Sequence, residues 1–154
     1  MTTGVQALMR EVEQVRDAFH AAVFSAADPD AALAVTAPGC TLVNLPMGTG
    51  ATGSEDLRRY LTQDLLPHLP ADLSFTRLSR TADRWRVAEE ATARFTHDRE
   101  LPWLLPGAPP THRRAQVLTV SVVTVERSRI TSHRTLWDLS GLVSQLELVP
   151  PRPR

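Results

Sequence analysis

PGAPPTHRR at residues 106–114 and ITSHRTLWDLSGLVSQLEL at residues 130–148 are the two stretches that decide the fold of this chain. The second stretch ends an apolar strand at Asp138, and three polar or aromatic side chains shortly precede that carboxylate: His133, Arg134 and Trp137. A carboxylate buried at such a place loses solvation, which disfavours its charged form and raises its pKa. We therefore predict that Asp138 is a proton-transfer group facing a cavity that the rest of the chain encloses.

The first half of the chain has the pattern of helices. Apolar residues recur at three- and four-residue steps over 5–27, which predicts an amphipathic helix. Asp28 is the expected N-cap of a short second helix. Ser54 is the expected cap of a third helix that stops within residues 67–70, and the glycine-bearing stretch 47–53 before it is expected to be a loop.

The second half has the pattern of strands. Segments rich in Val, Thr and Ala, together with one short segment of the first half, predict five strands: 40–45, 72–80, 85–97, 115–126 and 129–138. The stretch 101–114 is too dense in proline for regular structure, and 140–148 predicts a short closing helix. Helices first and long strands afterwards predict an α+β fold, in which a curved, mixed or antiparallel sheet wraps around the N-terminal helix and leaves a cavity at its open end.

The composition narrows the class of protein. The 154 residues carry 17 basic and 17 acidic side chains, so no net charge draws the chain to nucleic acid or to a membrane. We expect one cytoplasmic domain over residues 1–150 and a disordered tail at 151–154. No residue is lysine, which excludes Schiff-base chemistry and a covalently held pyridoxal group. Cys40 is the lone cysteine and the histidines lack ligand spacing, so we expect neither a cofactor nor a metal.

Alternation along the strands predicts which side chains face inward. The large apolar residues of 85–97 occupy odd positions, which places Glu89 and His97 on the inner face as well. His133 and Asp138 differ by five positions, so an unbroken strand would put them on opposite faces.

Two features qualify the role of Asp138. Arg134 shares its face, and pairing between the two would lower the pKa of the carboxylate. Alternatively, Asp138 caps the helix that begins near Ser140, because a capping carboxylate accepts backbone N–H bonds.

Three patterns in the last third of the chain are typical of one known family. They are G-x-PPT-x-RR from Gly107, I-x-x-HR-x-x-x-D from Ile130 and L-x-x-QL from Leu142. On these residues the chain resembles the SnoaL-like polyketide cyclases of the nuclear transport factor 2-like superfamily. A weaker likeness extends over the whole chain and includes Asn44.

The resemblance implies a cone-shaped α+β barrel with a deep apolar pocket, assembled as a homodimer. It implies that Asp138 acts as general acid/base in a cofactor-free intramolecular aldol closure, and that Asn44 lines the pocket. The family carries a histidine on the strand before the last, and counting back from Asp138 places Ser121 at this position. The chain departs from the family there.

The remaining candidates are imidazoles and aromatic side chains near the predicted cavity. His97 and His133 are expected to assist Asp138 in catalysis, because a histidine titrates near neutrality. Seven residues are expected to bind the substrate: Asn44, Phe95, Trp103, His112, Ser121, Arg134 and Trp137.

These residues predict a cofactor-independent cyclase or isomerase that folds a polyketide-like small molecule in its pocket and promotes ring closure. One alternative is an epoxide hydrolase of the limonene epoxide hydrolase type, with Asp138, Arg134 and Glu89 around one water. The other alternative is a dimeric module that binds a small molecule without transforming it.

Overall fold

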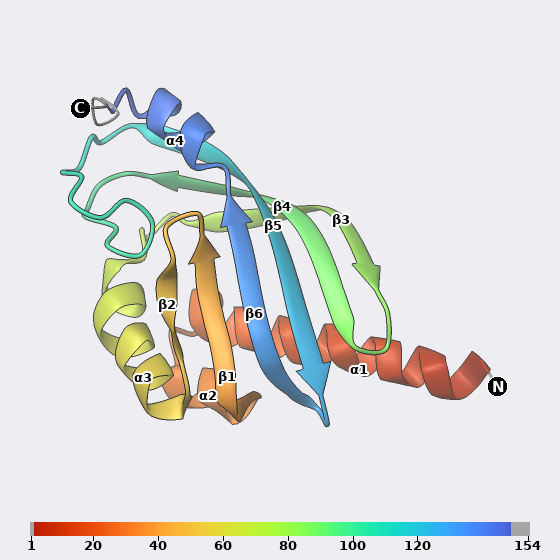
Figure 1. Ribbon diagram of the computed structural model, residues 1–154. Coiled ribbons are helices and arrows are strands. Elements are labelled where there is room, and N and C mark those ends of the chain that lie inside the picture. The colour runs from red at the N-terminus through yellow and green to blue at the C-terminus, as the bar shows by residue number, and fades with distance from the viewer. Residues whose placement is uncertain (1, 149–154) are drawn as a thin grey trace.

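A six-stranded sheet in the order β2-β1-β6-β5-β4-β3 curls around the N-terminal helix α1 (Figure 1). This computed structural model describes residues 2–148, and the predicted tail at 151–154 lies outside them. Neighbouring strands are antiparallel except β1 and β6, which run parallel. The sheet stays open, with β2 and β3 at its edges. The predicted α+β fold, a curved mixed sheet around the first helix, is confirmed.

The first two helices follow the sequence pattern. α1 spans Thr2–His20 and continues as a π-helical segment, Ala21–Ser25. Asp28 caps α2 (Pro29–Ala34) as predicted, because its carboxylate accepts a hydrogen bond from the Ala31 amide at 3.1 Å.

The third helix has three parts: α3 (Ser54–Arg59), a π-helical segment (Tyr60–Leu65) and a 3₁₀ turn (Leu66–His68). Its N-cap is Gly53, so the predicted cap at Ser54 is wrong. Ser54 is already helical, and its hydroxyl donates to the Pro38 carbonyl at 3.3 Å.

Five strands lie close to the predicted segments: β1 (Thr36–Leu45), β3 (Ser74–Ala82), β4 (Arg86–Thr96), β5 (Arg114–Glu126) and β6 (Arg129–Trp137). The sixth, β2 (Thr49–Thr52), pairs with β1 inside the stretch expected to be a loop. A Cβ at Gly50 would lie 2.0 Å from the Leu42 carbonyl oxygen, so the close pairing requires glycine. Because glycine is depleted in strands, β-propensity does not predict β2.

The inner face of the sheet follows the predicted alternation. On β4 the odd positions are buried: Val87, Glu89, Ala91, Ala93 and Phe95. They face α1, whose own buried residues include Val12, Val15 and Phe19. The next odd residue, His97, is fully buried just beyond the strand end.

A cluster of charges ties α1 to this inner face. Glu89 is only 5% exposed, and both of its carboxylate oxygens accept hydrogen bonds from guanidinium groups. Oε2 accepts from Arg16 of α1 at 2.6 Å. Oε1 accepts from Arg77 at 2.8 Å and from Arg80 at 2.9 Å, both on β3. Arg80 also contacts Asp17 of α1 at 2.6 Å, so the helix and two strands share one network.

Glu89→Gln should destabilise the protein, because removing one partner of a buried ion pair leaves uncompensated charge. We expect the free energy of unfolding, measured by urea denaturation, to fall by about 3 kcal/mol. Glu90→Gln is the matched control, since this neighbour is exposed on the outer face, and it should change stability by less than about 0.5 kcal/mol. Equal effects of the two substitutions would contradict the structural role of Glu89.

Candidate functional site

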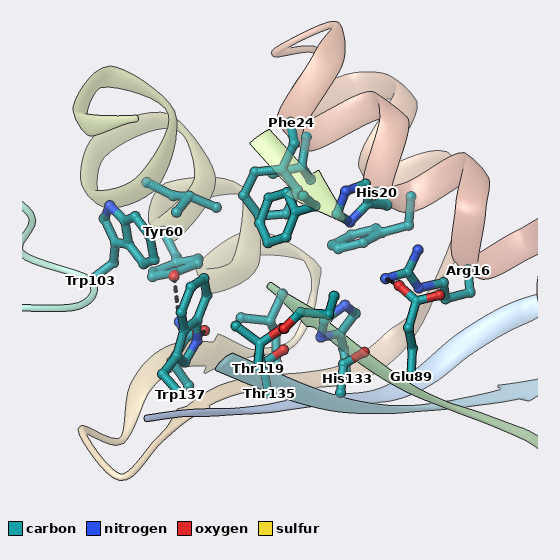
Figure 2. A pocket seen from close by; sticks show the side chains of 18 residues that line it. Arg16, His20, Phe24, Tyr60, Glu89, Trp103, Thr119, His133, Thr135 and Trp137 are labelled. Atoms are coloured by element: carbon teal, nitrogen blue, oxygen red, sulfur yellow. Dashed lines mark hydrogen bonds and ion pairs between the residues drawn. The ribbon is translucent and has the colours of Figure 1, made fainter. Parts of the chain in front are cut away.

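The concave side of the sheet holds a pocket between the strands and the covering helices (Figure 2). Both π-helical segments contribute lining residues, and Trp103 of the proline-rich loop closes one end. The pocket contains about 600 Å³ of space that no atom fills, including its open mouth. The centre of a water molecule can reach about 50 Å³ of this space. An engineered cavity that binds benzene measures about 150 Å³. A ligand of two rings therefore needs lining side chains to move.

Hydrogen bonds at one end of the pocket have a fixed direction. The indole N–H of Trp137 can only donate, and it donates to Asn44 Oδ1 at 3.0 Å. The Asn44 amide nitrogen then points the other way and donates to the Tyr60 hydroxyl at 2.8 Å and to Thr49 Oγ1 at 3.3 Å. Because the Tyr60 oxygen accepts this bond, and its proton meets no acceptor among the described residues, the proton is free for a ligand.

The Tyr60 hydroxyl remains protonated at neutral pH. Burial raises the pKa of Tyr60, an effect that the hydrogen bond from Asn44 only partly offsets. Tyr60 begins the second π-helical segment, and such segments are frequent at functional sites. Tyr60 is thus a hydrogen-bond donor at the aromatic end of the pocket, between Trp103 and Trp137 (Figure 2).

Two neutral histidines lie between the aromatic end of the pocket and the Arg16–Glu89 ion pair (Figure 2). Burial, and then the positive charge of Arg16, lower the pKa of His20 and of His133 to about 4. The His20 ring packs against Phe24 and Phe75, with centroids 4.7 and 4.8 Å away. Nδ1 of His133 is sealed without a partner among the described residues, whereas its Nε2 is not sealed and opens onto the pocket.

Asp138 lies outside this pocket, so the prediction that it faces the cavity is wrong. β6 ends one residue earlier, at Trp137, and the chain turns into α4 (Leu139–Gln145). The Asp138 carboxylate is exposed and accepts a hydrogen bond from the Gly141 amide at 3.0 Å. The alternative interpretation, a helix cap, is confirmed.

Four other predicted site residues also lie away from the pocket. Arg134 is exposed on the outer face of β6 and forms no ion pair with Asp138 among residues 2–148. His112 is exposed in the loop, and Phe95 belongs to the core. His97 points inward as predicted, but its Nδ1 accepts a hydrogen bond from the Thr111 amide at 3.2 Å. This bond joins the two ends of the proline-rich loop.

The structure gathers the remaining predicted residues in the pocket lining: Asn44, Trp103, Ser121, His133 and Trp137. His133 and Asp138 lie on opposite faces, as the alternation predicted.

Sequence analysis missed five polar lining residues: Arg16, His20, Tyr60, Thr119 and Thr135. The first two were within reach, because they share one helical face with Phe19 and Val23 at three- and four-residue steps. Tyr60 was within reach as well, because it follows Leu57 by three residues and precedes Leu61 on the buried face of the third helix.

Within the described part of the chain, no three His, Cys, Asp or Glu side chains gather so that they could hold a metal ion. None of the helices between residues 2 and 148 has the length and apolar character needed to cross a membrane.

Comparison with known proteins places this chain in a family. The model of the SnoaL-like polyketide cyclases matches residues 3–146. The chain belongs to this family. No curated protein matches it.

Solved structures share the SnoaL-like fold at low sequence identity. TsrD from Streptomyces laurentii is 21% identical with a TM-score of 0.71, covering 91% of this chain and 97% of its own. An NTF2-like protein from Burkholderia thailandensis E264 is 17% identical with a TM-score of 0.65, covering 88% and 96%. A hypothetical protein with a ketosteroid isomerase-like fold from Catenulispora acidiphila DSM 44928, in complex with trimethylamine, is 19% identical with a TM-score of 0.63, covering 88% and 97%. Likeness of this degree shows the fold alone.

The two pocket histidines should make stability depend on pH between about 6.5 and 4. In this window the unfolded chain, with a histidine pKa near 6.5, binds protons that the folded protein excludes. The free energy of unfolding should therefore fall as the pH falls, by about 3 kcal/mol per histidine. Urea denaturation at pH 7 and pH 4 measures this loss.

His133→Asn should remove about half of that pH dependence. His112→Asn is the control, because His112 is exposed, and it should keep the wild-type dependence. A stability that is constant over this pH range would refute the assignment of two buried neutral imidazoles.

Proposed function

We propose that this SnoaL-like chain is a cofactor-independent cyclase or isomerase that moves a proton next to a carbonyl group of a polyketide-like small molecule. The proposal depends on one observation: an apolar pocket contains both a phenol with a free proton and a neutral imidazole with an open nitrogen, Tyr60 and His133. Membership of the family supports a small-molecule cyclase or isomerase in general. Strongly shifted pKa values inside the pocket favour an enzyme over a simple binding module.

In the proposed reaction, the carbonyl oxygen accepts a hydrogen bond from Tyr60 while His133 Nε2 takes a proton from the adjacent carbon. The electron pair of the broken C–H bond gives an enolate, whose negative oxygen Tyr60 stabilises. His133 then returns the proton to another carbon, which isomerises the substrate, or to the alkoxide formed when the enolate carbon closes a ring on a second carbonyl. A base with a pKa of about 4 to 5 suffices when strong donors hold the enolate.

His133 suits the role of base better than His20. Both rings line the pocket, but the His133 ring packs against one aromatic side chain, Phe19 at 5.2 Å, whereas the His20 ring packs against two, Phe24 and Phe75. The pocket also contributes by confinement, since holding a flexible chain in a folded conformation lowers the entropic barrier to ring closure.

Tyr60→Phe and His133→Asn should each abolish most of the proton transfer. We expect wild-type protein to accelerate exchange of the α-protons of 2-tetralone in deuterium oxide, followed by NMR. Removing an enolate-stabilising donor typically costs about 10²-fold or more in rate, and loss of the base costs about 10²- to 10⁴-fold. The wild-type rate should fall only as the pH drops through about 4, where His133 gains a proton.

His112→Asn is the control for this experiment, because His112 is exposed outside the pocket. Its exchange rate should equal that of the wild-type protein. If the wild-type protein gave no acceleration, or if both pocket variants kept it, the proposed chemistry would be wrong.

The epoxide hydrolase alternative finds no support in the geometry. Its three expected residues do not meet, because Asp138 and Arg134 lie outside the pocket. Both oxygens of Glu89 are already bound by arginines, which leaves no free carboxylate oxygen to activate a water.

We also propose that the chain forms a homodimer through the outer face of the sheet. Leu118 and Leu136 are 45% and 52% exposed there on neighbouring strands, and Val120 lies directly opposite Leu136. Large apolar side chains that adjoin on an exposed sheet face are typical of a protein interface.

Leu136→Glu should convert the dimer to a monomer, because a charge in an apolar interface is costly to desolvate. Light scattering after gel filtration measures the mass. Leu78→Glu is the matched control, since Leu78 is 58% exposed on β3, and it should leave the dimer intact. A monomeric wild-type chain, or dissociation by both variants, would contradict this interface.

A further inference from the structure

The register of the sheet places four polar side chains in one row across the pocket floor. Glu89 of β4 lies opposite Ser121 of β5, and Ser121 lies opposite Thr135 of β6. Thr135 in turn lies opposite Asn44 of β1. All four line the pocket, and each is 5–9% exposed.

The rows on either side of these four are largely apolar or aromatic. They consist of Ala91, Thr119 and Trp137 on one side, and Val87, Val123, His133 and Leu42 on the other. The floor is therefore a narrow polar strip between two less polar ones.

Both ends of the strip are hydrogen-bonded within the protein. Glu89 accepts bonds from three guanidinium groups, which also balance its charge. The Asn44 amide donates to Tyr60 and Thr49 and accepts from Trp137. Neither end has a free donor for a ligand.

The two middle residues differ from the ends. The hydroxyls of Ser121 and Thr135 form no hydrogen bond with any other described residue, and neither oxygen is among the sealed unpartnered atoms of residues 2–148. Both are therefore reachable from the pocket. Thr119, one row away, instead donates to the Ala91 carbonyl at 3.1 Å. A buried hydroxyl without a partner is costly, so Ser121 and Thr135 require an acceptor inside the pocket.

The spacing of the two hydroxyls fits a single oxygen atom. Side chains directly opposite each other on neighbouring strands have Cβ atoms about 5 Å apart. A hydroxyl donates over about 2.7 to 2.8 Å. An oxygen between Ser121 and Thr135 can therefore accept from both. We propose that these two residues form a hydroxyl clamp, which binds an oxygen atom of the ligand at the middle of the pocket floor.

The clamp specifies a class of ligand. This step depends on the proposed function, which places a first oxygen of the ligand at Tyr60. Asn44, which binds Tyr60, lies one and a half strand spacings from the centre of the clamp, roughly 7 Å. The ligand is therefore an apolar, neutral molecule with two oxygens about this far apart. A charged ligand does not fit, because the arginines beside the pocket already pair with Glu89 and Asp17.

Binding of two related ketones tests the clamp. The probes are 2-tetralone and 6-hydroxy-2-tetralone, which carries a second oxygen on the opposite ring, and quenching of the tryptophans in the pocket wall gives both Kd values. Wild-type protein should bind the hydroxylated compound about tenfold more tightly, as expected for two added hydrogen bonds of ordinary strength. Ser121→Ala and Thr135→Val should each reduce this preference to threefold or less.

Two further variants separate recognition from packing. Thr135→Ser keeps the hydroxyl and should keep the tenfold preference. Thr124→Val removes a hydroxyl from the outer face of β5 and should also keep it, because Thr124 points away from the pocket. No preference in the wild-type chain, no binding of the hydroxylated compound, or an unchanged preference in both clamp variants would overturn the proposal.

The binding ratio is independent of proton transfer, so the two proposals can fail separately. A tenfold preference without α-proton exchange would keep the clamp and reject the enolate chemistry. Exchange without a preference would keep the chemistry and reject the clamp.

Discussion

The buried carboxylate of Glu89 is the constraint on which the rest of this structure depends. An inward carboxylate on the concave face of a sheet is tolerated only with close positive partners. Arg16 supplies one from α1, and Arg77 and Arg80 supply two from β3. The same contacts fix the position of the helix over the sheet. The pocket is the space that remains between them.

The chemistry of the pocket follows from a series of hydrogen bonds whose direction is fixed by one residue that cannot accept. Trp137 can only donate, so the Asn44 amide has one orientation, and the Tyr60 proton is left for a ligand. Each step uses a different element: β6, β1 and the third helix. The direction of the Tyr60 donor is thus set by the sheet register, although Tyr60 sits on a helix.

The sequence predicted the fold better than the site. Richness in Val, Thr and Ala located four strands of the second half, and period-two alternation placed Glu89 and His97 on the inner face, because both signals repeat over many residues. β2 was missed because the close backbone contact at Gly50 excludes the side chains that mark a strand.

The errors at the site have equally local causes. Asp138 was assigned to the cavity from its place after an apolar strand, but the strand ends at Trp137 and the carboxylate caps the next helix. The two roles cannot be told apart from one residue type at one spacing. Tyr60 shares its helix face with Leu57 and Leu61, so its helical spacing does not separate a pocket donor from a core aromatic.

The parallel pairing of β1 with β6 also governs when the site can exist. The hydrogen bond from Trp137 to Asn44 joins residues 93 positions apart, and contacts of such long range form late because closing the loop between them costs entropy first. A chain still emerging from the ribosome holds β1 without its partner and cannot orient the amide. The donor at Tyr60 is thus absent until the last strand docks, so a half-folded chain has no competent pocket.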